Sequence, residues 1–178
     1  MRKFNAVLTA LILILFILHS VFGAFLMLGM GSGALKTAAW VAAGLTVLHV
    51  IVGVKLTIDT LKVQKKTGAA YFKENRLFWA RRISGLAVMV LLVFHFTAFG
   101  KTENGVYRLV PFDFIKMWVQ ILLAAALGTH IISNVRPMLI SFGVKGIKEH
   151  IGEILFVLAV IILFAAAAFA VYYLRWMA

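Results

Sequence analysis

Residues 81–100 read RRISGLAVMVLLVFHFTAFG and decide the fold class of this chain. Two arginines and a Ser-Gly pair precede an apolar run, and one histidine, His95, lies deep inside it. Ionisable side chains within a membrane are costly and need partners, so each is a candidate functional residue. Three further apolar segments each contain one comparable histidine, namely His19, His49 and His130.

The composition is typical of an integral membrane protein. Hydrophobic residues make up 63% of the 178 residues and the mean hydropathy is +1.03, whereas a soluble domain is about half apolar. The net charge of +12 would indicate nucleic-acid binding in a soluble protein. Here the basic residues gather in loops beside apolar runs, so we expect membrane lipid and no nucleic acid as partner. Because there is no cysteine, thiolate-ligated clusters and covalent haem attachment are excluded.

Five segments are near the length of about 20 apolar residues that a spanning helix needs. They are residues 5–30, 37–61, 82–100, 114–140 and 151–173. We therefore predict an all-α integral membrane protein with five transmembrane helices, a single domain over residues 1–178. Helices one to four, each with one histidine, would form a four-helix bundle with the fifth at its periphery. The first segment could also be read as a signal peptide, but its length favours a retained helix.

The basic residues outside the apolar segments predict the orientation. Cytoplasmic loops of membrane proteins carry an excess of Lys and Arg. The side that would hold the N-terminus has most of them, whereas the opposite side has Lys36, Lys101, Arg108, Lys116 and Arg175. We therefore expect the N-terminus in the cytoplasm and the C-terminus outside.

The four histidines fall at two depths. With a rise of about 1.5 Å per residue, His19 and His95 lie toward the outer half of the membrane, and His49 and His130 near its inner edge. In an up-down bundle, helices one and three face each other diagonally, as do two and four. Diagonal axes about 12 to 14 Å apart leave room for two imidazoles and a metal ion. The geometry thus predicts two pairs, His19 with His95 and His49 with His130, each as axial ligands of a haem iron.

Residues near the histidines fit a flat, anionic group. Gly23 and Gly53 each follow a histidine by four residues, so they share its helical face and could let a porphyrin lie against the backbone. Haem propionates need cationic partners near the membrane edge. The basic residues available on the inner side are Lys55, Arg81, Arg82 and Arg136. His150, at the start of the fifth helix, is expected in the headgroup region.

The arrangement resembles the cytochrome b membrane-anchor subunit of succinate:quinone oxidoreductases, in the single-subunit, two-haem class of succinate dehydrogenases and fumarate reductases. Residues 82–85 (RISG) ahead of His95 resemble the Arg-x-Ser/Thr-Gly lead into the third ligand of that family. His130 followed by Asn134 and residues 139–143 (LISFG) resembles the stretch after the fourth ligand. The resemblance covers nearly the whole chain in topology.

This resemblance implies two haem b groups, one nearer the cytoplasm on His49 and His130 and a distal one on His19 and His95. It implies a flavoprotein subunit and an iron–sulfur subunit on the cytoplasmic face of a bacterial cytoplasmic (inner) membrane. Electrons would pass between menaquinone or another quinone and a dicarboxylate site on another chain. Members of the class can carry a glutamate two residues before the fourth ligand, where this chain has Gly128.

Two alternatives stay open. One is a cytochrome b subunit of a quinone-linked formate dehydrogenase or hydrogenase, although those families tend to place two ligands on one helix. The other is a proton or metal transporter that uses the same histidines. Proton relays usually combine histidine with carboxylates, and few carboxylates lie within the apolar segments here. If the chain acts on a quinol instead, Glu103 and Asp113, in the connection between the third and fourth segments, could accept its protons on the outer side.

Overall fold

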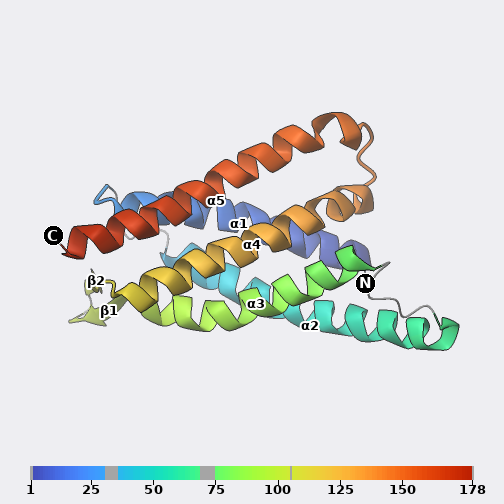
Figure 1. Ribbon diagram of the computed structural model, residues 1–178, viewed down its shortest axis with the longest axis horizontal. Helices are drawn as coiled ribbons and strands as arrows, with labels where there is room; N and C mark the ends of the chain where they lie inside the picture. Colours follow the sequence, from blue (N-terminus) through green and yellow to red (C-terminus); the bar gives the residue numbers. More distant parts are fainter. Residues whose placement is uncertain (1, 31–35, 69–74, 105, 178) are drawn as a thin grey trace.

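The computed structural model describes residues 2–30, 36–68, 75–104 and 106–177. These residues form five long helices, each apolar enough to cross a membrane, which confirms the predicted all-α membrane fold (Figure 1). The helices are α1 (Arg2–Met27), α2 (Lys36–Thr67), α3 (Arg76–Ala98), α4 (Phe114–Ser141) and α5 (Ile147–Met177). Two short antiparallel strands, β1 (Gly100–Glu103) and β2 (Val106–Leu109), connect α3 to α4 and were not predicted.

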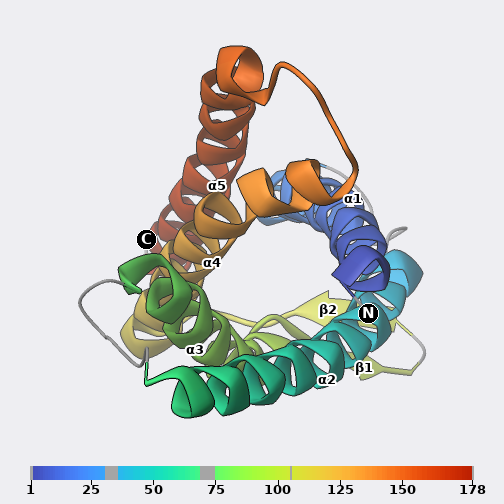
Figure 2. The same cartoon turned by 90° about the vertical axis from the view of Figure 1, so that its right-hand side faces the viewer.

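The first four helices form a ring, and α5 lies outside it. Figure 2 looks along the bundle and shows α1, α2, α3 and α4 around a common axis. In this arrangement α1 packs on α2 and α3 on α4, while α5 packs on both α1 and α4. The order around the ring places α1 opposite α3 and α2 opposite α4. The fifth helix is therefore peripheral, as predicted.

Glycine turns set two helix ends. The last turn of α1 closes with hydrogen bonds from Gly29 N to Leu26 O and from Met30 N to Phe25 O. Gly29 has a φ of +83°, a left-handed conformation that glycine adopts without steric cost in this terminating motif. The helix therefore ends at Met27 and not at Met30, where the apolar run ends. The same pair of bonds forms around Gly143 (φ +72°) at the end of α4.

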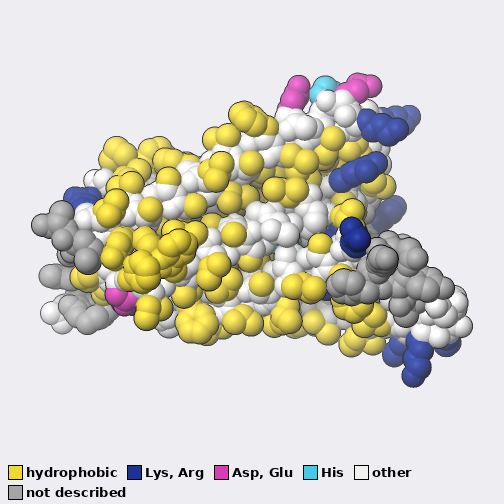
Figure 3. All heavy atoms as spheres, viewed as in Figure 1, with side chains coloured by type: hydrophobic (Ala, Val, Ile, Leu, Met, Phe, Trp, Pro, Cys, Tyr) yellow, Lys and Arg dark blue, Asp and Glu magenta, His cyan; other side chains and the backbone are white. Residues whose placement is uncertain are grey.

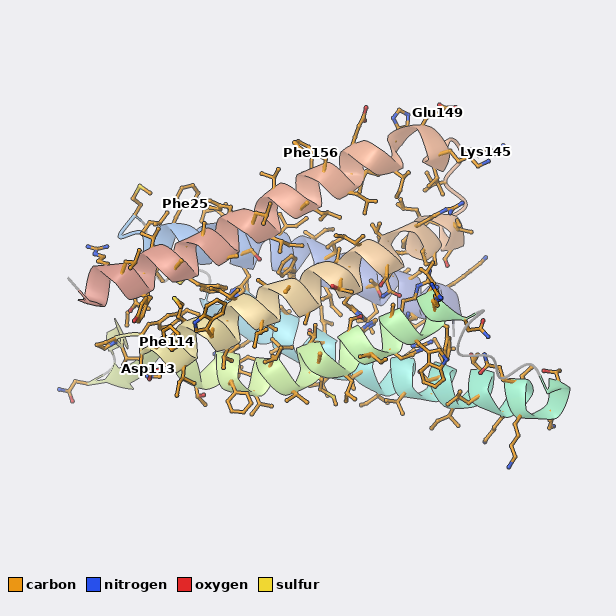
Figure 4. All side chains as sticks on the ribbon, viewed as in Figure 1. Phe25, Asp113, Phe114, Lys145, Glu149 and Phe156 are labelled. Carbon is orange, nitrogen blue, oxygen red and sulfur yellow. The ribbon has the colours of Figure 1, made fainter. Side chains whose placement is uncertain are left out.

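The two ends of the bundle differ in charge, and its sides are apolar. Lys and Arg side chains gather at the end where the N-terminus lies, and hydrophobic side chains cover the length between the ends (Figures 1 and 3). Large side chains such as Ile115 and Phe156 are 74% and 70% exposed, which suits contact with lipid. Figure 4 places Asp113 and Phe114 at one end of the bundle and Lys145 and Glu149 at the other. Thus α4 crosses the full length of the apolar region.

Candidate functional site: two histidine pairs in the helix ring

The structure brings the four histidines together in two pairs, each of which joins opposite helices of the four-helix ring. The imidazole centres of His19 on α1 and His95 on α3 lie 5.8 Å apart, with 74° between the imidazole planes. Those of His49 on α2 and His130 on α4 lie 6.3 Å apart, with 78° between the planes. These are the pairs that the helix order predicted.

The spacing within each pair suits one metal ion between two imidazoles. Two metal–nitrogen bonds of about 2 Å, plus about 1 Å from each nitrogen to its ring centre, give a separation of about 6 Å. The observed 5.8 and 6.3 Å match this value. Among the described residues there is no cluster of three or more His, Cys, Asp or Glu that could hold a metal ion. The geometry therefore fits two bis-histidine sites better than one compact site.

The Nδ1 atoms of three of these histidines lie near side-chain oxygens of neighbouring residues. His95 Nδ1 lies 2.8 Å from Oε1 of Gln120 on α4. His130 Nδ1 lies 3.3 Å from Oγ of Ser84 on α3. His49 Nδ1 lies 3.4 Å from Oγ1 of Thr9 on α1. Within the described part of the chain, the ring of His19 has no hydrogen-bond partner.

These oxygens act as acceptors. The Thr9 hydroxyl donates its hydrogen to the carbonyl of Asn5, and the Ser84 hydroxyl donates to the carbonyl of Arg81. Each hydroxyl therefore offers a lone pair to the histidine, as the amide oxygen of Gln120 does. The nitrogen that carries the proton is set by the hydrogen bond it makes. This pattern favours the tautomer with the proton on Nδ1 in all three imidazoles, which leaves the Nε2 lone pair available to a metal.

The glycines near the histidines have different surroundings. A Cβ added at Gly23 or Gly53 would meet no atom within 4 Å, although both residues are half-buried. Open space on a half-buried face is what a flat cofactor against the backbone requires. At Gly85 a Cβ would lie 3.0 Å from Cε1 of His130. Thus Ser84 and Gly85, which precede His95 in sequence, both contact the ring of His130.

The two adjacent arginines of α3 have different roles. Arg81 donates from Nε to the backbone carbonyl of Ser133 on α4, at 2.8 Å. The Nε of Arg82 is buried and, among the described residues, has no partner. Its guanidinium lies 5.1 Å from the centre of the Phe78 ring and close enough to His49 and His130 to act on both electrostatically. A buried cationic donor without a partner beside this pair fits the carboxylate of a propionate.

The other two basic residues that were predicted to bind propionates are exposed. They are Lys55 on α2 and Arg136 on α4, and within the described part of the chain neither side chain bonds to a histidine of the two pairs. His150 is exposed at the start of α5, where its Nδ1 lies 3.5 Å from a carboxylate oxygen of Glu153.

Asp113, one of the two carboxylates considered as proton acceptors, is not part of the two pairs. Asp113 caps α4 by accepting a 2.7 Å hydrogen bond from the backbone N–H of Lys116. This hydrogen bond, helped by the Lys116 ammonium, holds the pKa of Asp113 below its ordinary value, so the group is a poor base. The side chain of Glu103 lies outside the described part of the structure. Gly128 faces α5, because an added Cβ would lie 3.7 Å from Ile162.

Sequence reasoning missed Gln120 and Thr9. Gln120 is fully buried, with an exposed fraction of 0%. It is a polar residue within an apolar segment, and that is a signal of function in a membrane helix. Its partner His95 is on another helix, so no spacing rule could have linked the two.

Together, the fold and the histidine pairs define a multi-pass membrane protein with a candidate bis-histidine metal site at each of two levels. Comparison with protein-family models, with curated proteins and with solved structures finds no match for this chain.

Proposed function

We propose that this chain is the di-haem cytochrome b membrane anchor of a succinate dehydrogenase or fumarate reductase. It would pass electrons between a membrane quinone, such as menaquinone, and iron–sulfur and flavoprotein subunits. The observation that carries the proposal is the spacing of 5.8 and 6.3 Å in the two histidine pairs, combined with Nδ1 partners that leave Nε2 free.

Each site would use residues from opposite helices of the ring. His49 and His130 would ligate the inner haem, and His19 and His95 the outer one. Gly53 and Gly23 would leave room for the porphyrin beside His49 and His19. When bound, a haem with two histidine ligands supplies one-electron transfer, because both axial positions are filled.

Arg82 is the best-supported residue for binding an inner propionate. Its buried Nε lacks a partner among the described residues, and a charge-assisted bond to a carboxylate would satisfy it. Arg81 uses its Nε for the carbonyl of Ser133 and would hold α3 against α4. Lys55 and Arg136 would contribute to the positive potential of this end, since both are exposed.

The basic end of the bundle is the proposed cytoplasmic face. By the positive-inside rule, an end rich in Lys and Arg stays in the cytoplasm, which in a bacterium is the inner side of the cytoplasmic membrane. The flavoprotein and iron–sulfur subunits would dock there, and the dicarboxylate chemistry would take place on them. The C-terminus would then lie outside.

The proposal is tested by asking which donor reduces the chain in its own complex. The tagged chain is purified in detergent from its native membranes, and its visible spectrum is followed after each substrate is added. A b-type spectrum that succinate reduces, or that fumarate reoxidises, supports the proposal. Reduction by formate or hydrogen alone would assign the chain to another quinone-linked dehydrogenase. A colourless protein that binds or moves metal ions would favour the transporter.

A further inference from the structure

Gln120 is a polar side chain in an unusual position for a membrane helix. It lies near the start of α4 and is the largest fully buried side chain among the described residues. Burying a carboxamide in apolar surroundings costs free energy unless hydrogen bonds compensate. Its Oε1 lies 2.8 Å from Nδ1 of His95, whereas its Nε2 has no partner in the described part of the chain. The bond to His95 is thus what compensates its burial.

This bond is the shortest of the three to the histidine rings. The corresponding distances are 3.3 Å from Ser84 to His130 and 3.4 Å from Thr9 to His49. Both hydroxyls also bond to a carbonyl of their own helix, while the Gln120 side chain has His95 as its hydrogen-bond partner. On another side of the His95 imidazole, the Phe99 ring makes an edge contact, with 4.9 Å between the two ring centres. His95 is therefore the most firmly oriented of the three.

We infer that Gln120 is a positioning residue for His95 and sets the properties of the outer site. The inference rests on the proposed function and extends it to a residue on a third helix. The amide oxygen of Gln120 keeps the proton of His95 on Nδ1 and fixes the imidazole between α1 and α4. The Nε2 lone pair of His95 would then be directed at the outer haem iron. A hydrogen bond from Nδ1–H also raises the basicity of Nε2, which favours ferric over ferrous iron and lowers the midpoint potential.

Two substitutions at Gln120 are informative, because its amide Nε2 has no partner among the described residues. Gln120→Glu keeps an oxygen acceptor at nearly the same position and removes a donor that bonds to nothing in the described structure. Gln120→Leu has similar volume but removes the acceptor and leaves the Nδ1–H of His95 buried without a partner. If Gln120 served packing alone, Gln120→Leu would perturb the outer site less than Gln120→Glu. A positioning role predicts that Gln120→Leu perturbs it more.

The test is a redox titration and a haem assay on the full-length chain in detergent. A His49→Ala background isolates the outer haem, and the wild-type background, with two redox components resolved, serves if that variant does not fold. Gln120→Leu should weaken outer haem binding by about 10- to 100-fold and raise the midpoint potential of the remaining outer haem. Gln120→Glu should retain the haem and lower its potential. Ser84→Ala is the matched variant for the inner pair and should move the potential of the inner haem instead.

The outcomes distinguish the positioning role of Gln120 from the proposed function itself. If both Gln120 variants bind haem normally and shift neither potential, or shift both in the same direction, the positioning role is wrong while the proposed function stands. If Gln120→Leu shifts the inner and outer components equally, its effect is general and the inference also fails. If the wild-type chain holds no haem, the proposed function fails and this inference fails with it.

Discussion

Arg81 Nε donates a 2.8 Å hydrogen bond to the backbone carbonyl of Ser133, four residues before Pro137 in α4. Proline has no N–H, so the carbonyl four residues earlier loses its helical partner. Within a membrane such a carbonyl must be satisfied by a neighbouring element. Arg81 does this from α3, and the bond ties the two helices together next to His130.

This relationship predicts coupling between Arg81 and Pro137. Arg81→Ala should destabilise the folded chain by about 1 to 3 kcal/mol, because a partly buried carbonyl that has no helical partner loses its donor. In a Pro137→Ala background the loss should be smaller, since the introduced alanine has a backbone N–H that can donate to the Ser133 carbonyl within the helix. A double-mutant cycle on unfolding in detergent measures the difference. Strictly additive effects would show that the two residues act independently.

Gly53 and Gly23 are predicted to matter for the cofactor and not for folding. Because a Cβ at either position meets no protein atom within 4 Å, leucine should be tolerated by the protein itself and should favour the helix. Gly53→Leu should remove the inner haem and Gly23→Leu the outer one, each seen as a loss of about half the haem per chain. Gly44 also has open space around it but is exposed, so Gly44→Leu is the control. Full haem content in Gly53→Leu would argue against a porphyrin beside α2.

The angles between the histidine planes predict a magnetic signature. The planes are 74° and 78° apart in the two pairs. On the proposed haem iron, two nearly perpendicular imidazoles would interact almost equally with the two π-type d orbitals. These orbitals would then stay close in energy and make the g tensor strongly anisotropic. Electron paramagnetic resonance of the oxidised protein should therefore show highly anisotropic low-spin ferric signals. The ordinary rhombic signal of parallel imidazoles would contradict this geometry.

The cap of α4 predicts a dependence of stability on pH. The backbone N–H of Lys116 lowers the pKa of Asp113 in the folded chain. Since the folded pKa is below the unfolded value of about 3.9, the stabilisation is complete above that value and is lost as pH falls through the folded pKa. Asp113→Ala should lower the melting temperature at pH 7, and the difference from wild type should shrink toward pH 3. Asp113→Asn should keep most of the cap. A difference that stays constant with pH would mean that the ionised carboxylate is not what stabilises the helix.

The sequence predicted the five spans and the pairing of the histidines, because both follow from apolar length and helix order. The helix ends were predicted less well, because apolar patterns indicate which residues lie in the hydrocarbon region and not where the backbone leaves the helix. Thus α2 continues to Thr67, six residues beyond the predicted end at Leu61. The hairpin Gly100–Glu103 with Val106–Leu109 was also missed, because each strand has only four residues and lies in the connection between two apolar segments.

The partners of the histidines could not be predicted from spacing. His95 and Gln120 are 25 residues apart, and their contact depends on how α3 and α4 pack. Arg81 and Arg82 were equivalent in sequence, but the carbonyl freed by Pro137 engages the Nε of Arg81. Only the packed structure separates the two arginines.

The central claim is that two histidine pairs hold two haems, and the most direct measurement is the haem-to-protein ratio of the purified chain with its reduced-minus-oxidised spectrum. Two haem b per chain are expected. His49→Ala should remove one haem and His19→Ala the other, each leaving its counterpart in place. A chain purified without haem, or one whose haem content is unchanged by both substitutions, would contradict this claim.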